Sequence, residues 1–285
     1  MKATFAPQHL LCLVDLSPAS PVVLSWARLV ANHFHPDLEI LHADWPGESK
    51  LSGEEEEASW AQVQMRKTEL AGELERIADA VFVSGVPYRV LVEVGHPVQV
   101  VLQYLGAHVP DLIVMGSHGE DGAAHVLLGS VAENLVRVAN CPILIAKGNQ
   151  LARGQKQLQR VVCPTNLGDF SMQCLDAACA IAAVTGASVD SVLSLEEAHV
   201  SSEQGRTRLH EWIPAQLRER CSITETILRG DPAEQLIGLL RREASDLVVV
   251  GAEHRPFFEY TTLGRTTEKV MRFSPCTVVV VPQKV

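Results

Sequence analysis

The chain has 285 residues, of which 47% are hydrophobic and 20% are charged, and its formal net charge at pH 7 is −10. This length and composition predict a globular chain of about two domains. The negative charge argues against nucleic acid or an anionic membrane as the main partner, because phosphate contacts need clustered Lys and Arg.

The first apolar run, residues 10–14, is interrupted by Asp15 and is too short for a signal-peptide core or a membrane span, so we expect a strand there. The seven cysteines are odd in number and show no CxxC or Cys/His spacing. Both features indicate a cytoplasmic protein with reduced, buried thiols and no membrane insertion.

Short apolar runs alternate with amphipathic segments along the rest of the chain, which is typical of βαβ units and a parallel sheet. In the first half we predict strands at 10–14, 38–43, 88–94, 112–115 and 143–146. In the second half we predict strands at 160–163, 189–193, 224–228, 247–250 and 277–281. Helical periodicity fills the gaps, as at Val98, Val101, Leu102 and Leu105. Each half therefore reads as a doubly wound sheet of five strands and four helices.

The two halves are copies of one another. Residues 91–119 align without gaps with residues 226–254, and the constant offset of 135 joins six pairs: Gly95 with Gly230, Pro97 with Pro232, Asp111 with Asp246, Gly116 with Gly251, Gly129 with Gly264, and Cys141 with Cys276. Near the start the offset is 151, pairing Asp15 with Asn166 and Ser20 with Ser171. The first copy is thus longer by 16 residues, which we place near 45–59.

The repeat divides the chain into a first domain at 1–147, a polar linker at 148–157 and a second domain at 158–285. The fifth strands, 143–146 and 277–281, are apolar runs whose edges would be exposed in isolation. We expect them to pair with each other, which makes the chain an intramolecular pseudo-dimer.

A glycine-framed loop after the fourth strand of the first copy carries the chemistry. Gly116 and Gly119 let the backbone turn tightly and approach a ligand closely, and nine residues separate Gly119 from Gly129 and Ser130. The helix that follows presents free N–H groups and its positive end, which favour phosphate. Ser130 and Glu133 also have the spacing of a capping box.

The loop has the spacing G-x2-G-x9-G-S, and with the LVDLSPAS segment around Asp15 it resembles the universal stress protein family over nearly the whole chain, twice. The resemblance implies two tandem Rossmann-like, adenine nucleotide alpha hydrolase-like sheets flanked by helices, and an ATP site in the first copy. The implied nucleotide-binding residues are Asp15, Ala43, Met115, Gly116, His118, Gly119, Gly129, Ser130 and Val131. The sequence departs from the family pattern at Leu13, where proline is common, and at Ala43, where valine is common. No catalytic or metal-ligating residue is assigned, although Mg²⁺ accompanying the phosphates would meet Asp15 through water.

The second copy differs at the positions that matter for phosphate. His254 replaces the second glycine, Arg265 replaces the serine, and Asn166 stands where Asp15 stands in the first copy. We therefore predict that the second copy does not bind ATP in the same way. For Arg265 two readings stay open, a contact with an anion and a surface salt bridge or plug.

Three functions follow from these patterns. The first is a nucleotide-dependent regulatory binding protein of the stress response, in which ATP occupancy alters a surface read by an unidentified protein partner. The second is slow ATP hydrolysis or self-phosphorylation at Ser130 or a neighbouring hydroxyl. The third is a lipid or metabolite module that uses the altered second copy. Association of two chains into a homodimer also stays open.

Overall fold

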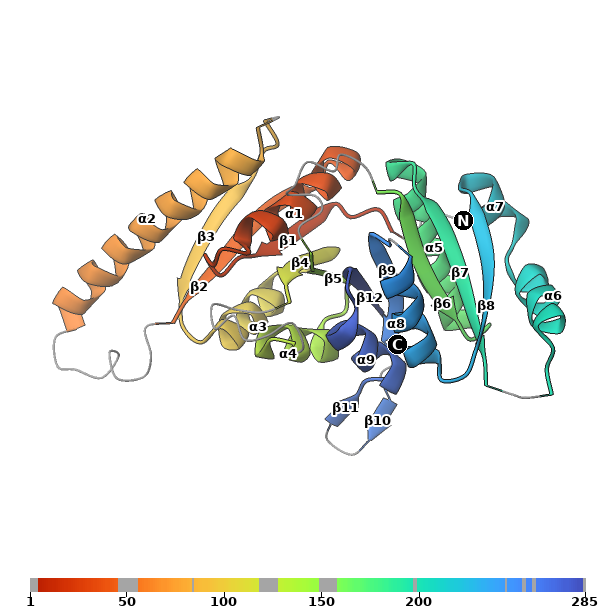
Figure 1. The fold of residues 1–285 in the computed structure, drawn as a ribbon. Helices are drawn as coiled ribbons and strands as arrows, with labels where there is room; N and C mark the ends of the chain where they lie inside the picture. Colours follow the sequence, from red (N-terminus) through yellow and green to blue (C-terminus); the bar gives the residue numbers. More distant parts are fainter. Residues whose placement is uncertain are drawn as a thin grey trace.

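The computed structural model describes residues 5–45, 56–83, 85–117, 128–148, 158–196, 199–243, 245–252, 255–257 and 260–283. The linker expected at 148–157 falls outside these ranges except for Gly148. Figure 1 shows the two halves side by side, with the first half at the red and yellow end of the chain. Within the described ranges, every helix is too short or too polar to cross a lipid bilayer.

Among the described residues, the first half follows the predicted order of five strands and four helices, whereas the second half has its five predicted strands with five helices and two additional short strands. The first half comprises β1 (His9–Leu13), α1 (Ser20–Phe34), β2 (Asp37–Asp44), α2 (Glu56–Val81), β3 (Arg89–Val94), α3 (Pro97–Ala107), β4 (Leu112–Gly116), α4 (Ser130–Val138) and β5 (Ile143–Ala146). The second half comprises β6 (Arg160–Thr165), α5 (Asp169–Thr185), β7 (Ser188–Leu195), α6 (Ser202–Trp212), α7 (Ala215–Arg220), β8 (Ile223–Arg229), α8 (Pro232–Arg242), β9 (Leu247–Ala252), β10 (Arg255–Phe257), β11 (Tyr260–Thr262), α9 (Arg265–Phe273) and β12 (Thr277–Pro282). All ten expected strands are present, each within two residues of its predicted bounds.

The strands of both halves join into one ten-stranded sheet with the order β3-β2-β1-β4-β5-β12-β9-β6-β7-β8. Pairing is parallel within each half. At the centre, β5 and β12 pair antiparallel, with Val279 opposite Leu144. The expected contact between the fifth strands is confirmed, and it relates the halves by a pseudo-twofold axis because antiparallel identical strands are related by a twofold rotation.

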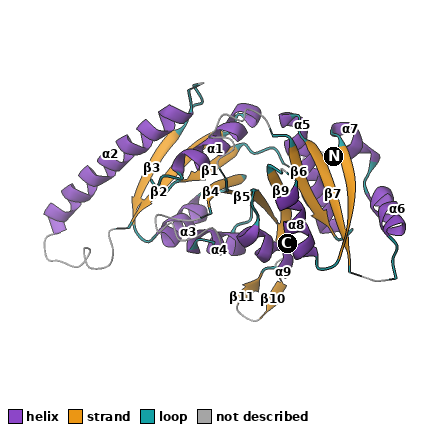
Figure 2. Ribbon diagram, in the orientation of Figure 1, coloured by secondary structure: helices purple, strands orange, loops and turns teal. Residues whose placement is uncertain are grey.

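Helices cover both faces of this sheet, as Figure 2 shows in purple against orange strands. The side chains of alternate strand residues point to opposite faces, so each face has its own core. One core runs from Leu24 of α1 through Leu10 of β1 to Leu175 of α5. The other runs from Leu135 of α4 through Ile113 of β4 to Leu240 of α8. Both cores span the two halves.

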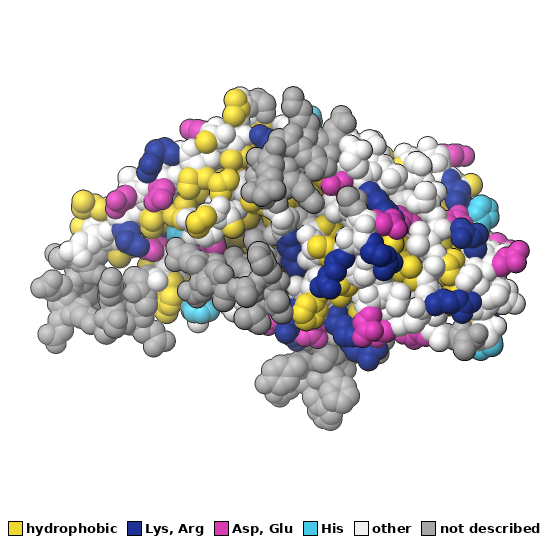
Figure 3. All heavy atoms as spheres, in the orientation of Figure 1, with side chains coloured by type: hydrophobic (Ala, Val, Ile, Leu, Met, Phe, Trp, Pro, Cys, Tyr) yellow, Lys and Arg dark blue, Asp and Glu magenta, His cyan; other side chains and the backbone are white. Residues whose placement is uncertain are grey.

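The halves differ most between their second and third strands, where the 16 surplus residues of the first copy lie. There the first half has the single 26-residue helix α2, whereas the second half has the short helices α6 and α7. Residues 46–55, part of the segment in which we placed the surplus, lie outside the described ranges. On α2, Trp60 and Met65 are 68% and 73% exposed. In Figure 3 hydrophobic side chains gather over α1 and α2, while charged side chains are spread over the second half.

Side chains also tie the halves together beside the central strands. The Lys147 ammonium donates to the carbonyl oxygens of Met271 and Arg272, at 2.6 and 3.2 Å, at the end of α9. Arg272 donates to Glu133 of α4 at 2.8 Å. Because a helix end leaves carbonyls without intrahelical partners, Lys147 supplies α9 with a cap from the other half.

The seven cysteines are present as thiols, and all are buried except the half-buried Cys221. Burial raises the pKa of the Cys276 thiol to about 11. A protonated, buried thiol is a poor nucleophile, so Cys276 acts as a small core residue, as the sequence indicated.

Candidate functional site

A cavity of about 850 Å³ opens at the carboxyl ends of β1, β2 and β4, beside the start of α4. Open parallel sheets bind ligands at this edge, next to the point where the strand order reverses. Seven residues predicted from the sequence line this cavity: Asp15, Ala43, Met115, Gly116, Gly129, Ser130 and Val131. The other two, His118 and Gly119, lie outside the described residues. The fold thus brings residues from four segments of the sequence around one space.

Asp15 holds the turn between β1 and α1. Its Oδ1 accepts hydrogen bonds from the Ser17 N–H at 3.0 Å and from the Ser20 hydroxyl at 3.3 Å. Asn166 makes the same two contacts in the second half, with the Gly168 N–H at 3.0 Å and the Ser171 hydroxyl at 2.7 Å. The turn therefore needs only an oxygen acceptor, and the negative charge is a property of the first half alone.

The inner wall of the cavity is apolar. Leu13 and Met115 are buried in the core on the α3 and α4 side, and the half-buried Ala43 packs against that core. His42 is buried, and its Nδ1 lies 2.9 Å from the Val14 carbonyl oxygen, so its ring is held by the backbone. A flat apolar ring fits such a wall.

The outer wall carries residues that the sequence did not single out. Trp45 follows β2 directly, and its ring meets His96 edge to face with centroids 5.5 Å apart. Arg66 reaches over from α2 and donates to the buried Asp44, with Nη2 2.9 Å from Oδ1. Hydrogen bonding and charge attraction from Asp44 raise the pKa of Arg66. The only sequence signal for these residues was the position of Asp44 and Trp45 immediately after a predicted strand. Arg66 gave no such signal, because it lies in the long helix α2, which the second half replaces with two short helices.

The other end of the cavity is the start of α4. Gly129 is the N-cap residue and its N–H donates to the Ser117 carbonyl oxygen at 2.8 Å. Ser130 and Val131 follow in the first turn, where backbone N–H groups have no intrahelical acceptor. These groups and the positive end of the helix favour an anion.

The expected capping box at Ser130 is wrong. Ser130 is the first residue of α4, one position after the N-cap, and its hydroxyl makes no capping hydrogen bond. Glu133 instead accepts a hydrogen bond from Arg272 of the second half. The N-cap belongs to Gly129, which has no side chain. Ser130 lines the cavity, and its side chain does not close the helix end.

The equivalent place in the second half holds an aromatic ring. Phe170 of α5 corresponds to Ala19, which lines the first-half cavity, and Gly251 corresponds to Gly116. A Cβ at Gly251 would lie 2.5 Å from Phe170 Cε1 and 3.0 Å from Cys174 Sγ. The ring therefore packs directly on the glycine backbone, and we call this contact the Phe170 plug.

Arg265, which stands at the position of Ser130, is also engaged. Its guanidinium lies 2.9 Å from Asp231, the residue that caps α8 by accepting from the Glu234 N–H at 3.0 Å. Of the two alternatives that the sequence left open for Arg265, the structure has the surface salt bridge. The His254 side chain, the other predicted obstruction, lies outside the described residues.

Similarity to known proteins agrees with this architecture. The family model described as the universal stress protein family matches residues 7–147 and 157–282. A universal stress protein of Mycobacterium tuberculosis is 30% identical over 152 residues, which cover 50% of this chain and 46% of that protein. One from Methanocaldococcus jannaschii is 42% identical over 53 residues, which cover 19% of this chain and 31% of that protein. These matches thus span less than half the length of either curated relative.

Among solved structures, a universal stress protein from Archaeoglobus fulgidus superposes with a TM-score of 0.75, at 19% identity and with 100% of both chains covered. A universal stress protein solved in complex with cAMP is 25% identical over 44% of this chain, with a TM-score of 0.37. The first likeness shows the fold over the full length, and the family model matches each half separately. The chain therefore belongs to the universal stress protein family and carries two of its domains in tandem.

Proposed function

We propose that this chain binds one adenine nucleotide, in the first-half cavity, and acts as a nucleotide-dependent regulatory binding protein. The observation that carries the proposal is the placing of an apolar wall at Ala43 and Met115 and a helix start at Gly129 and Ser130 around one cavity. A nucleotide has the matching parts, an aromatic base and an anionic phosphate chain.

Mg²⁺ would arrive with the phosphates. Among the residues that the structure describes, no group of three His, Cys, Asp or Glu side chains is placed to hold a metal ion. Asp15 offers one carboxylate at the cavity, which suits a cation that keeps most of its waters and is shared with phosphate oxygens.

Binding of a ligand in the cavity would change the protein surface through α2. Arg66, Leu70 and Glu73 of this helix line the cavity, while Trp60 and Met65 on the same helix are exposed. A ligand that binds more tightly to one position of α2 than to another shifts the population of that position. In the proposal, the exposed surface of α2 therefore depends on whether a nucleotide is bound.

The test is titration calorimetry with ATP, ADP and AMP on the wild type, Gly129→Glu and Gly264→Glu. A carboxylate at position 129 should repel the phosphates at the start of α4 and abolish the measured binding. Gly264→Glu makes the same change at the start of α9, where a Cβ meets nothing within 4 Å, and should bind as the wild type does. Unchanged ATP affinity in Gly129→Glu, or an equal loss in both variants, would contradict the proposed site.

A further inference from the structure

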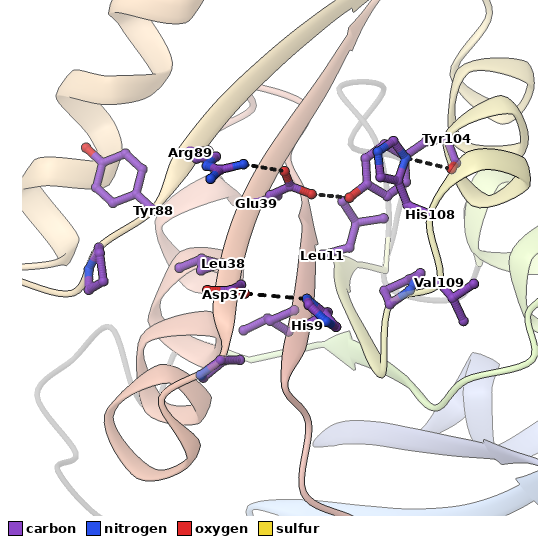
Figure 4. Close-up of a pocket in the computed structure, with 14 residues that line it drawn as sticks. His9, Leu11, Asp37, Leu38, Glu39, Tyr88, Arg89, Tyr104, His108 and Val109 are labelled. Atoms are coloured by element: carbon purple, nitrogen blue, oxygen red, sulfur yellow. Dashed lines mark hydrogen bonds and ion pairs between the residues drawn. The ribbon is translucent and has the colours of Figure 1, made fainter.

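A second cavity lies at the opposite edge of the sheet. It encloses about 640 Å³ at the amino ends of β1, β2 and β3, beside the end of α3 (Figure 4). It is thus separated from the first cavity by the length of the strands. The strand residues His9, Glu39 and Arg89 meet there with Tyr104 and His108 from the end of α3.

The fixed charges of this cavity favour a cation. Glu39 accepts a hydrogen bond from the Tyr104 hydroxyl, and burial together with this carboxylate raises the pKa of Tyr104. Asp37 stands two residues along the same strand, on the same face of the sheet, but its side chain is 89% exposed and lies 3.7 Å from the His9 ring, so Glu39 is the main negative charge of the cavity. The end of α3 adds the negative pole of a helix. Arg89 is 4.0 Å from Glu39, but its side chain is 83% exposed to water, so it does not fill the space.

Aromatic faces line the same space. The rings of Tyr104 and His108 stack with centroids 4.3 Å apart and planes 16° from parallel. Figure 4 shows this pair beside Glu39 and above Leu11, with the Tyr104 hydroxyl directed at the carboxylate. A carboxylate beside an aromatic pair is a combination that binds ammonium and guanidinium groups, through charge and, at the outer face of a ring, through cation–π attraction.

The second half provides an internal comparison, and its hydrogen bonds fix the correspondence. Asp111 accepts from the Gln8 and His9 N–H groups, and Asp246 accepts in the same way from the N–H groups of Gln159 and Arg160. The position of His9 in the first half is therefore the position of Arg160 in the second.

At that equivalent place the second half holds a guanidinium of its own. Arg160 bonds to Asp190, which stands at the position of Glu39, and to Glu243, which stands at the position of His108. Asp190 is 1% exposed and also accepts from the Thr226 hydroxyl at 2.7 Å. The repeat therefore keeps a carboxylate at this place in both halves, with an arginine side chain upon it in one and a cavity in the other.

We propose that the cavity at the amino ends of β1, β2 and β3 binds a small aliphatic cation bearing a guanidinium or ammonium group. The charged head pairs with Glu39, as Arg160 pairs with Asp190, and the hydrocarbon chain lies along the Tyr104 and His108 rings. The site is independent of the proposed nucleotide site, since the two open at opposite ends of the strands.

The experiment titrates the full chain with agmatine and with putrescine by calorimetry and by NMR. The uncharged 1,4-butanediol and the dianion succinate serve as matched comparison ligands. Three variants accompany the wild type: Glu39→Gln removes the carboxylate, His9→Arg installs the side chain of the second half, and Glu203→Gln makes the same charge change on the exposed first turn of α6.

We expect the wild type and Glu203→Gln to bind agmatine or putrescine and to bind neither the diol nor succinate. Glu39→Gln should weaken binding at least about tenfold, because a charge-assisted hydrogen bond is lost. His9→Arg should weaken it similarly and raise the thermal midpoint, because the new guanidinium occupies the space. No binding of either amine, equal binding of succinate, or unchanged affinity in Glu39→Gln or in a folded His9→Arg would overturn the proposal.

Discussion

The Phe170 plug can be tested by adding a single methyl group. In Gly251→Ala the new Cβ would lie 2.5 Å from Phe170 Cε1, whereas carbon atoms pack best at about 3.5–4.0 Å. The ring or the backbone must therefore move by about 1 Å. Overpacking of this kind costs about 1–3 kcal/mol. We expect Gly251→Ala to lower the free energy of unfolding by this amount.

The assay is urea unfolding followed by circular dichroism, and the decisive comparison is with the Phe170→Ala background. Removing the ring should remove most of the cost of Gly251→Ala and leave a smaller part, because Cys174 Sγ remains 3.0 Å away. Gly72→Ala on α2 is the control, since a Cβ there meets nothing within 4 Å and alanine favours a helix by about 1 kcal/mol. If Gly251→Ala costs as much without the ring as with it, Phe170 does not occupy that space.

Two further substitutions test interactions inside the sheet assembly. Lys147→Met should destabilise the fold by about 1–2 kcal/mol, because the carbonyls at the end of α9 lose their donor. Burial lowers the pKa of Lys147 from 10.5 to about 8, so between these values the unfolded chain holds a proton that the folded chain has released. The free energy of unfolding of the wild type minus that of Lys147→Met, measured in urea, should therefore rise from pH 8 towards 10.5, because the buried thiols contribute equally to both proteins. A difference that stays flat over this range would refute this origin. Asp190→Asn should cost about 3 kcal/mol, because it leaves the Arg160 charge without its buried partner. The exposed Asp169→Asn is its control, and a similar midpoint in both variants would contradict the importance of that pair.

The two halves retain one architecture and have lost symmetry in their cavities. At the carboxyl edge, the first half has an open cavity over Gly116, and the second has Phe170 on Gly251. At the amino edge, the first half has a cavity over Glu39, and the second has Arg160 on Asp190. In both places a large side chain of the second half takes the space that stays open in the first.

Hydrophobic periodicity predicted the strands closely because they are short runs rich in apolar residues, and the inner ones, such as Leu112–Gly116, are buried on both faces of the sheet. The paired apolar edges of β5 and β12 were also predictable, since an exposed edge of that kind needs a partner. The failure of the predicted capping box at Ser130 could not be foreseen, because the same two residue types serve equally well as an N1 serine and as a partner for Arg272.

The sequence did not identify Trp45, Arg66 and His96 as residues of the cavity, for a different reason. Their contacts join the ends of β2 and β3 to α2, and nothing in local spacing reports how far a helix projects beside a sheet. Phe170 escaped likewise, because an aromatic residue near the start of an amphipathic helix reads as ordinary core.

The sequence by itself determined the repeat, the α/β class, the succession of strands along the chain and the glycine and serine positions of the first loop. These features depend on local periodicity and on residue types with few alternatives. Only the tertiary structure decided which spaces remain open, because a cavity depends on the side chains that several distant segments bring together. Phe170 fills the space that stays open beside its equivalent, Ala19. Arg160 likewise fills the space that stays open beside its equivalent, His9.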